Sequence, residues 1–318
     1  GDRECQLHSR GPQMTIGSGA AIFGCAGPEL LAGERAFFRD YDPFGFILFA
    51  RNVETPDQLR RLTADLRDAV GRDAPVLVDQ EGGRVQRLRA PYWREWEPPL
   101  DTVARSASRD AAVSAMYLRA RIIAAELRDV GIDADCAPVA DVARDCTHPF
   151  LKNRCYGTDP DTVSAISRAV ADGLLDGGVL PVVKHMPGHG LSWMDTHHDL
   201  PTVTTPAPEL DRMDFAPFRA LADLPMAMTA HIIYAAHDSL PATQSPTMIR
   251  LIRDEIGFRG LLMTDDLNME ALKGTLASRT AASLAAGCDI ALHCKGDFAQ
   301  MQEVAAAAGP MRDDTRAR

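Results

Sequence analysis

Residues 181–201 read PVVKHMPGHGLSWMDTHHDLP and place four histidines and two aspartates within twenty-one residues. Three prolines or glycines lie between the first and the third histidine, so this backbone cannot be helical. Imidazoles and carboxylates at this density fit a metal site, an acid/base site for a sugar or ester, or a solvated polar loop. Density alone leaves the three open, and the surrounding elements must decide.

Composition narrows the class of protein. The chain has 318 residues, of which 46% are hydrophobic, enough to bury the core of one large domain or two ordinary ones. A formal net charge of −10 argues against nucleic acid or an anionic membrane surface as the main partner. The longest apolar runs are too short to cross a bilayer. Seven scattered cysteines without CxxC spacing predict reduced thiols in a cytoplasmic enzyme.

The two ends of the chain differ in composition from the rest. The first 13 residues lack the apolar stretch of a secretory signal. We expect residues 1–13 to be a non-native or disordered leader before a natural start at Met14. Residues 14–318 are expected to form one catalytic domain, with a loose, charged tail after about Gly309.

Eight short apolar runs alternate with longer segments of helical periodicity. They cover residues 20–27, 45–50, 75–81, 132–141, 181–185, 225–233, 260–266 and 288–294. The runs lack polar alternation, which indicates strands buried on both faces, as in parallel sheets covered by helices. Helix start and stop signals predict helices over 55–70, 108–131 and 245–257.

Eight strand–helix units without a dividing linker predict an α/β fold, a single-domain (β/α)8 barrel. A doubly wound open sheet is the alternative. That fold would require a glycine-rich first turn, and the GCAG after the first run lacks the G-x-G-x-x-G spacing of nucleotide binding.

Polar residues recur where the apolar runs end. They are Asp79, Glu81, Asp141, Lys184, His185, His231, Asp265, Asp266 and His293. In a barrel these positions converge on the C-terminal face, where active sites lie. Some strand-end residues only cap helices or satisfy loop backbone, and we expect this role for Asp141, Asp266 and His293.

Four motifs carry a family resemblance. They are VDQEGGRVQRL (78–88), KNRCYGTDP (152–160), KHMPGHG…DTHHDLP (184–201) and MTDDLNMEAL (263–272). With these motifs, in this order, the sequence resembles the β-N-acetylglucosaminidases of glycoside hydrolase family 3, of the bacterial single-domain, peptidoglycan-recycling type. The resemblance extends from about residue 20 to residue 300 and implies a (β/α)8 barrel, which the periodicity predicts independently.

The resemblance implies catalytic roles for three residues. Retaining glycosidases need a nucleophile and a proton donor. The nucleophile falls on Asp265, which would form a covalent glycosyl ester, with Asp266 as a structural neighbour. The acid/base falls on a dyad in which Asp195 orients His197.

The resemblance also implies substrate contacts. They fall on Asp79, Arg87, Arg154, Lys184 and His185. Forked and paired polar groups of this kind fit vicinal sugar hydroxyls. Glu81 is expected instead to support Arg84 or Arg87.

The histidine-rich loop is expected to move. Gly188 and Gly190 would give it the freedom to close over the barrel mouth, and His189 and His198 would make loop-stabilising hydrogen bonds. We expect segment 186–199 to be open or disordered in the free enzyme.

The expected function is removal of nonreducing terminal N-acetylglucosamine (GlcNAc) from peptidoglycan fragments such as GlcNAc-1,6-anhydro-MurNAc peptides, with no cofactor and no metal. The expected partner is a small carbohydrate, a muropeptide or GlcNAc glycoside, and the expected state is a cytoplasmic monomer or weak dimer. Three alternatives stay open. They are a metal-dependent barrel hydrolase with His185, His189, His197 and Asp265 as ligands, a phosphorylase that uses the same dyad, and a silent sugar-binding relative.

Overall fold

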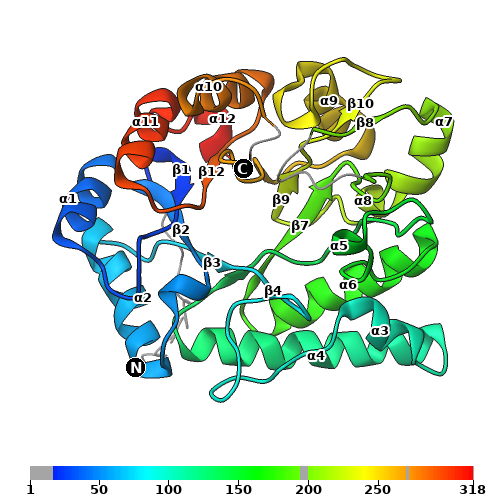
Figure 1. Cartoon of the computed structure of the whole chain (residues 1–318), viewed down its shortest axis with the longest axis horizontal. Coiled ribbons are helices and arrows are strands. Elements are labelled where there is room, and N and C mark those ends of the chain that lie inside the picture. Colours follow the sequence, from blue (N-terminus) through cyan, green and yellow to red (C-terminus); the bar gives the residue numbers. More distant parts are fainter. Residues whose placement is uncertain (1–16, 194–199, 270–271, 318) are drawn as a thin grey trace, which may run out of the picture.

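The computed structural model describes residues 17–193, 200–269 and 272–317, which form a parallel barrel surrounded by helices (Figure 1). Its strands are β1 (Gly19–Phe23), β2 (Pro43–Leu48), β3 (Val76–Val78), β6 (Ala134–Asp135), β7 (Leu180–Met186), β9 (Met226–Thr229), β11 (Leu261–Met263) and β12 (Ala291–His293). They pair in the order β11-β9-β7-β6-β3-β2-β1-β12, and a parallel bridge from Met263 to Ile290 brings β11 back beside β12. Each predicted run overlaps one of these eight barrel strands, so the predicted (β/α)8 fold is confirmed.

Helices follow the strands around the barrel. They are α1 (Ala32–Tyr41), α2 (Pro56–Val70), α3 (Pro99–Ala104), α4 (Arg109–Asp129), α5 (Pro149–Lys152), α6 (Pro160–Asp176), α7 (Ala207–Glu209), α8 (Ala216–Ala220), α9 (Pro246–Leu251), α10 (Leu276–Ala286), α11 (Phe298–Ala308) and α12 (Asp313–Arg316). Thr55, Ser108 and Ser245 cap α2, α4 and α9 with side-chain oxygens, which confirms the predicted helix starts. A π-helical turn (Ile252–Ile256) extends α9 to Gly257. In the described ranges, no helix is long and apolar enough to span a bilayer.

Two small sheets are inserted where barrel strands finish. β4 (Gln80–Gly82) and β5 (Val85–Gln86) form an antiparallel hairpin after β3. β8 (Thr202–Val203) follows β7 and pairs in parallel with β10 (Ile233–Tyr234), which follows β9. Both insertions therefore build the C-terminal face of the barrel.

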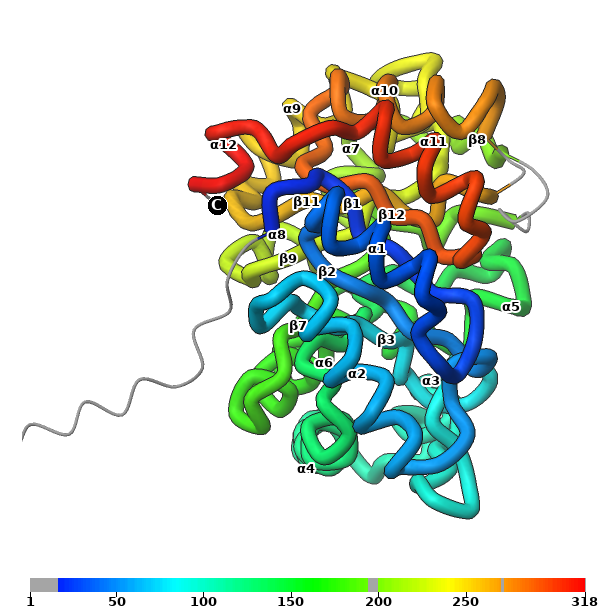
Figure 2. The backbone as a smooth tube through the Cα atoms, turned by 90° about the vertical axis from the view of Figure 1, so that its left-hand side faces the viewer, coloured from blue at the N-terminus to red at the C-terminus, as the bar shows by residue number. Residues whose placement is uncertain are grey.

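Apolar side chains fill both faces of the strands, as the unbroken apolar runs predict. Ile22, Leu77 and Met228 belong to a buried cluster made largely of strand residues, which fills the barrel. Phe23, next to Ile22 on β1, packs outward with Phe38 of α1. On the outside, α4 and α6 lie side by side in both views (Figures 1 and 2).

The C-terminal segment packs on the barrel. Met311 is buried, and its N–H donates to the carbonyl of Ser18 at 2.6 Å. Thr315 of α12 is also buried and donates its hydroxyl to Asp289 Oδ1 at 2.8 Å. The prediction of a loose tail after Gly309 is therefore wrong for the residues described. The charged composition of this segment predicts exposure, but Met311 and Thr315 within it are buried against the barrel.

Candidate active site

A cavity of about 370 Å³ lies at the end of the barrel where the strands finish. All five predicted substrate residues and the predicted nucleophile line it, namely Asp79, Arg87, Arg154, Lys184, His185 and Asp265. They come from four separate stretches of the chain, and the parallel strands bring them to one face. Phe49, Phe150 and Met269 add apolar wall.

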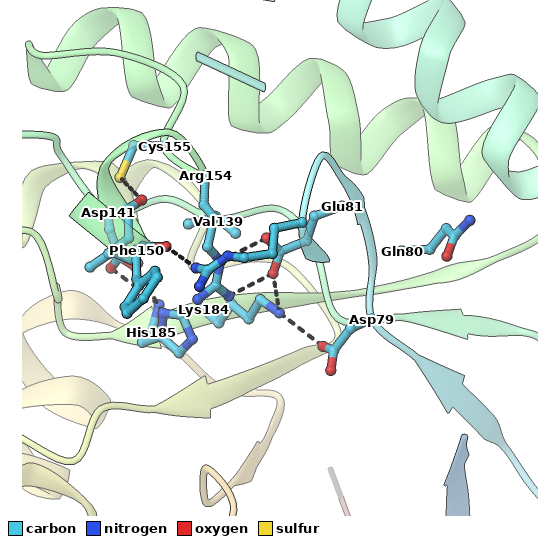
Figure 3. Close-up of polar contacts among 12 residues, drawn as sticks. Asp79, Gln80, Glu81, Val139, Asp141, Phe150, Arg154, Cys155, Lys184 and His185 are labelled. Atoms are coloured by element: carbon cyan, nitrogen blue, oxygen red, sulfur yellow. Dashed lines mark hydrogen bonds and ion pairs between the residues drawn. The ribbon is translucent and has the colours of Figure 1, made fainter. Parts of the chain in front are cut away.

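Charged side chains form a connected cluster on one wall (Figure 3). Lys184 Nζ lies 3.0 Å from Asp79 Oδ1 and 2.6 Å from Glu81 Oε1. Arg154 donates two hydrogen bonds to the Glu81 carboxylate, from Nε to Oε2 at 2.9 Å and from Nη2 to Oε1 at 2.7 Å. Arg87 Nη2 donates to Asp79 Oδ2 at 3.3 Å. The cluster therefore holds three cations around two carboxylates.

Glu81 has a different partner from the one predicted. Its side chain is fully buried and bonds Arg154 and Lys184 rather than Arg84 or Arg87. The expectation that it supports Arg84 or Arg87 is wrong. Arg154 lies far away in sequence, so only the closed barrel reveals the pairing.

Neighbouring charges keep this cluster ionised. Burial opposes ionisation of the two carboxyls, but Lys184 and Arg87 hold the pKa of Asp79 well below its usual range. Arg154 and Lys184 likewise lower the pKa of Glu81 from 4.5 to about 2 in spite of its burial. The same carboxylates raise the pKa of Lys184, although burial alone would lower it. The wall therefore offers fixed donors and acceptors at neutral pH.

The β4–β5 hairpin is held in place by polar side chains. Gln80 Oε1 accepts the N–H groups of Arg87 and Leu88, at 2.9 and 3.1 Å. Arg119 of α4 donates to the Glu81 carbonyl at 2.7 Å and occupies the space that a Cβ on Gly82 would need. A glycine with φ of +112° is therefore required at this turn.

A second polar group surrounds Asp141, which follows β6. Its Oδ2 lies 2.8 Å from His185 Nδ1, and its Oδ1 accepts the N–H groups of His185 and His189 at 3.2 and 2.8 Å. The predicted backbone role of Asp141 is confirmed. The bond to the His185 ring adds to it, because that ring lines the cavity.

The side chain of His189 does not make the predicted loop-stabilising hydrogen bond within the described residues, although its main-chain N–H bonds Asp141. Its ring lines the cavity beside His185, with centroids 5.3 Å apart, and its Nδ1 is buried with no partner in the described chain. Burial, aided by the nearby His185, lowers the pKa of His189 to about 4. The site therefore contains a neutral imidazole that the sequence left without a chemical role.

Asp265 follows β11 and faces the cavity beside Asp266. Asp265 Oδ1 accepts the Asp266 N–H at 2.8 Å. Burial opposes ionisation, but His231 and the hydrogen bond from the Asp266 N–H lower the pKa of the Asp265 carboxyl below its ordinary value. Burial instead raises the pKa of Asp266. The two adjacent carboxyls therefore differ in environment, as a nucleophile and a structural neighbour would.

Asp266 and His293, two other strand-end residues, differ in whether their side chains form hydrogen bonds. Asp266 Oδ1 accepts N–H groups from Asn268 and Cys294, both at 3.2 Å, so its predicted backbone role is confirmed. His293 is buried edge-on against Phe23, and neither of its ring nitrogens has a hydrogen-bond partner among the residues described. The predicted backbone role of His293 is therefore wrong.

Segment 186–193 is the described part of the loop expected to move. All residues from 186 to 190 are buried. The Tyr234 hydroxyl donates to the Gly188 carbonyl, and the Thr147 hydroxyl donates to the Gly190 carbonyl. The beginning of the loop is therefore fastened to the elements around it.

The two loop glycines serve close packing. A Cβ on Gly190 would overlap the Val142 carbonyl. Gly188 has φ of +145°, and a Cβ there would come within 2.8 Å of the Asp214 carbonyl. The expectation that these glycines supply freedom for closure is wrong, because both positions are confined by neighbouring backbone.

The predicted dyad lies outside the described residues. Asp195, His197 and His198 fall in the range 194–199, so their roles stay predictions. In the ranges described, no group of three or more His, Cys, Asp or Glu side chains is arranged to hold a metal ion. The metal-hydrolase alternative includes His197 and likewise stays open to experiment.

One contact in the cavity wall, between a cation and an aromatic ring, was not predicted from the sequence. Arg84 lies over the Phe150 ring at 4.2 Å from its centroid, and both line the cavity. Phe49 and Cys294 also line the cavity. Phe150 precedes the KNRCYGTDP motif and Arg84 lies within VDQEGGRVQRL, so proximity to the motifs was the one available signal.

Comparison with known proteins agrees with the geometry. Residues 30–312 match the family model of the glycosyl hydrolase family 3 N-terminal domain. A beta-hexosaminidase of Bordetella avium is 36% identical over 294 residues, covering 90% of this chain and 83% of the relative. A beta-hexosaminidase of Xylella fastidiosa is 38% identical over 280 residues, covering 86% and 82%. NagZ from Neisseria gonorrhoeae, solved in complex with N-trifluoroacetyl-D-glucosamine, aligns with a TM-score of 0.86 at 30% identity over 96% of this chain and 90% of that chain.

The family model covers all four motifs and every barrel strand except β1. Each of the motifs 78–88, 152–160, 184–201 and 263–272 lies within the range that the family model matches. The cavity at the strand ends gathers residues from all four. The chain belongs to glycosyl hydrolase family 3.

Proposed function

We propose that the protein is a retaining β-N-acetylglucosaminidase that removes nonreducing terminal N-acetylglucosamine through a covalent intermediate on Asp265. The observation that carries the proposal is the position of this carboxylate in a cavity lined by fixed polar groups. The names of the relatives, beta-hexosaminidase, and the N-acylated glucosamine bound to the Neisseria neighbour support this substrate class.

The charged wall suits a terminal sugar. A pyranose offers vicinal hydroxyls, each of which can donate one hydrogen bond and accept others. Lys184, Arg154 and Arg87 supply donors, while Asp79 supplies an acceptor. These groups are already paired with one another, so their geometry is set before substrate arrives. Such preorganisation reduces the entropy lost on binding.

The proposed chemistry begins with Asp265. Its ionised carboxylate attacks the anomeric carbon, the glycosidic C–O bond breaks, and a glycosyl ester forms. In the proposal His197 protonates the leaving oxygen and then deprotonates the water that hydrolyses the ester, while Asp195 orients the imidazole. Two displacements at the same carbon retain the anomeric configuration.

The proposal extends to the biological substrate and location. We assign the leaving group to a 1,6-anhydro-MurNAc peptide or a related peptidoglycan fragment, on the family resemblance. A cytoplasmic location is supported by the cysteines of the described chain, which are all free thiols.

A direct test compares two aryl glycosides. The enzyme should hydrolyse aryl N-acetyl-β-glucosaminide with a kcat/KM at least about 100-fold above that for aryl β-glucoside. The glucoside lacks the acetamido group, and a site built to bond that amide discriminates by several kcal/mol against a substrate without it. Release of β-configured N-acetylglucosamine, followed by NMR of the nascent sugar, should confirm retention. Equal rates on the two glycosides, or an α-configured first product, would contradict the proposal.

Two further comparisons separate the alternatives. Hydrolysis should proceed at the same rate after dialysis against EDTA, whereas a metal-dependent hydrolase would lose activity. Replacing inert buffer with phosphate should not produce N-acetylglucosamine 1-phosphate, whereas a phosphorylase would release it as the main product.

A further inference from the structure

We propose that Asp141 is a positioning residue that fixes the ring of His185, so that its Nε2 faces the substrate as a hydrogen-bond acceptor. The proposal rests on the proposed function, because it assigns His185 a contact with a sugar hydroxyl. Asp141 itself does not line the cavity. It therefore acts through His185.

The carboxylate of Asp141 is fully buried and uses both of its oxygens (Figure 3). Oδ1 accepts two main-chain N–H groups, from His185 at 3.2 Å and from His189 at 2.8 Å. Oδ2 lies 2.8 Å from His185 Nδ1. A carboxylate can only accept, so Nδ1 must carry the proton.

Protonation at Nδ1 determines what the other ring nitrogen does. In a neutral imidazole with Nδ1–H, Nε2 is an acceptor. In the described ranges the His185 ring makes its hydrogen bond through Nδ1, not Nε2, and the ring lines the cavity. It is therefore available to the substrate.

An acceptor is valuable at this place because the neighbouring charged side chains in the cavity are rich in donors. Lys184, Arg154 and Arg87 outnumber the two carboxylates Asp79 and Glu81, and Glu81 is fully occupied by cations. A hydroxyl that accepts from Lys184 or Arg154 still needs an acceptor for its own proton. His185 Nε2 supplies one, and its conversion to N–H would leave a buried hydroxyl proton unmatched.

Asp141→Asn isolates this effect. The two main-chain N–H groups can only donate, so they hold the Asn oxygen, and the Asn NH2 turns toward His185 Nδ1. That nitrogen must then accept, and the proton moves to Nε2. The variant therefore keeps the backbone bonds to His185 and His189 and inverts the imidazole tautomer.

Activity should change only while the His185 ring is present. We expect Asp141→Asn to lower kcat/KM for aryl N-acetyl-β-glucosaminide about 10–100-fold, the usual effect of one mismatched buried hydrogen bond. In a His185→Ala background the same change should cost less than about twofold. Loss of equal size in both backgrounds, or no loss in either, would overturn the proposal.

A spectroscopic readout works without substrate. ¹⁵N NMR of histidine-labelled protein should show His185 protonated on Nδ1 in the wild type and on Nε2 in Asp141→Asn. This measurement remains informative even if the wild-type enzyme fails to cleave N-acetylglucosaminides. Failure of the proposed function can therefore be told apart from failure of the positioning role of Asp141. An unchanged tautomer in a folded variant would refute the positioning role.

A matched control lies at the opposite end of the barrel. Asp133 is another carboxylate that accepts a strand N–H, from Val76 at 2.8 Å, and it pairs with Arg67. Asp133→Asn should leave kcat/KM within about twofold of wild type and the His185 tautomer unchanged. A loss as large as that of Asp141→Asn would mean that changing any carboxylate bonded to a strand N–H disturbs the site.

Discussion

Replacing Glu81 by glutamine tests whether the charged wall is held together by one buried carboxylate. The side chain is fully buried and accepts three bonds of 2.6 to 2.9 Å from Lys184 and Arg154. The amide of Glu81→Gln would keep the shape, but it would leave two buried cations short of one negative charge and would turn an NH2 toward them. Truncating one partner of a buried ion pair costs about 3–5 kcal/mol.

The pKa of Glu81 gives a second measure of the same effect. A fall from 4.5 to about 2 favours the ionised form in the folded protein by a few kcal/mol, because a tenfold change in acid dissociation is worth about 1.4 kcal/mol. Its direction and order of magnitude match the ion-pair figure. We therefore expect the free energy of unfolding of Glu81→Gln, measured by urea titration at pH 7, to fall by about 3 kcal/mol.

The effect should depend on pH in a defined direction. The folded-state pKa is depressed, so the stabilisation is complete above pH 4.5 and is lost as pH falls toward 2, because the unfolded chain binds the proton first. Wild type and Glu81→Gln should therefore converge in unfolding free energy over that window. A gap that widens as pH falls would refute the reasoning.

A nearby exposed pair provides the control. Glu95 lies 2.8 Å from Arg89 on the same loop, but both side chains are more than 40% exposed. Glu95→Gln should cost less than about 1 kcal/mol. If Glu81→Gln is no more destabilising than Glu95→Gln, the buried carboxylate does not hold the wall together. If Glu81→Gln is destabilised yet keeps its KM, the wall does not bind the sugar.

Three other predictions follow from the site. His197→Ala should lower kcat by roughly 10²–10⁴ on a glycoside with a poor leaving group and much less on an activated aryl glycoside; equal losses would indicate a binding or structural role. Gly190→Ala should destabilise the protein by about 1–3 kcal/mol, because the new Cβ overlaps the Val142 carbonyl. Gly27→Ala, where a Cβ meets nothing within 4 Å, should leave the unfolding free energy within about 0.5 kcal/mol; equal effects at the two glycines would contradict the packing account. Asp79→Asn should raise KM more than it lowers kcat, since Asp79 belongs to the wall assigned to sugar hydroxyls; a change confined to kcat would refute that assignment.

The barrel could be predicted because its signal is repeated along the chain. Each of the eight buried apolar runs predicts a strand, and capping residues such as Thr55 predict where helices begin. Together these elements are compatible with few folds. The convergence of Asp79, Lys184 and Asp265 on one cavity followed from their positions at strand ends. Family motifs assigned the roles, which periodicity alone could not.

The features that the sequence did not predict correctly depend on contacts between distant residues. A glycine that frees a loop and a glycine that permits close backbone packing look the same in a sequence. The expectation of loop freedom at Gly190 therefore failed. The pairing of Glu81 with Arg154 and the anchoring of Thr315 on Asp289 join residues more than 25 positions apart. His293 ends a strand on the face packed against Phe23, so its position predicted a polar role that its surroundings do not provide.

The central claim is that Asp265 forms the covalent intermediate. Incubation with a 5-fluoro N-acetylglucosaminide that carries an activated leaving group should accumulate the glycosyl-enzyme, because the fluorine slows its hydrolysis. Mass spectrometry after proteolysis should then find one added sugar on the peptide that contains MTDDLNM, at Asp265, and none in Asp265→Ala. A sugar attached to the segment 195–199, or an unlabelled enzyme that still turns the substrate over, would contradict the claim.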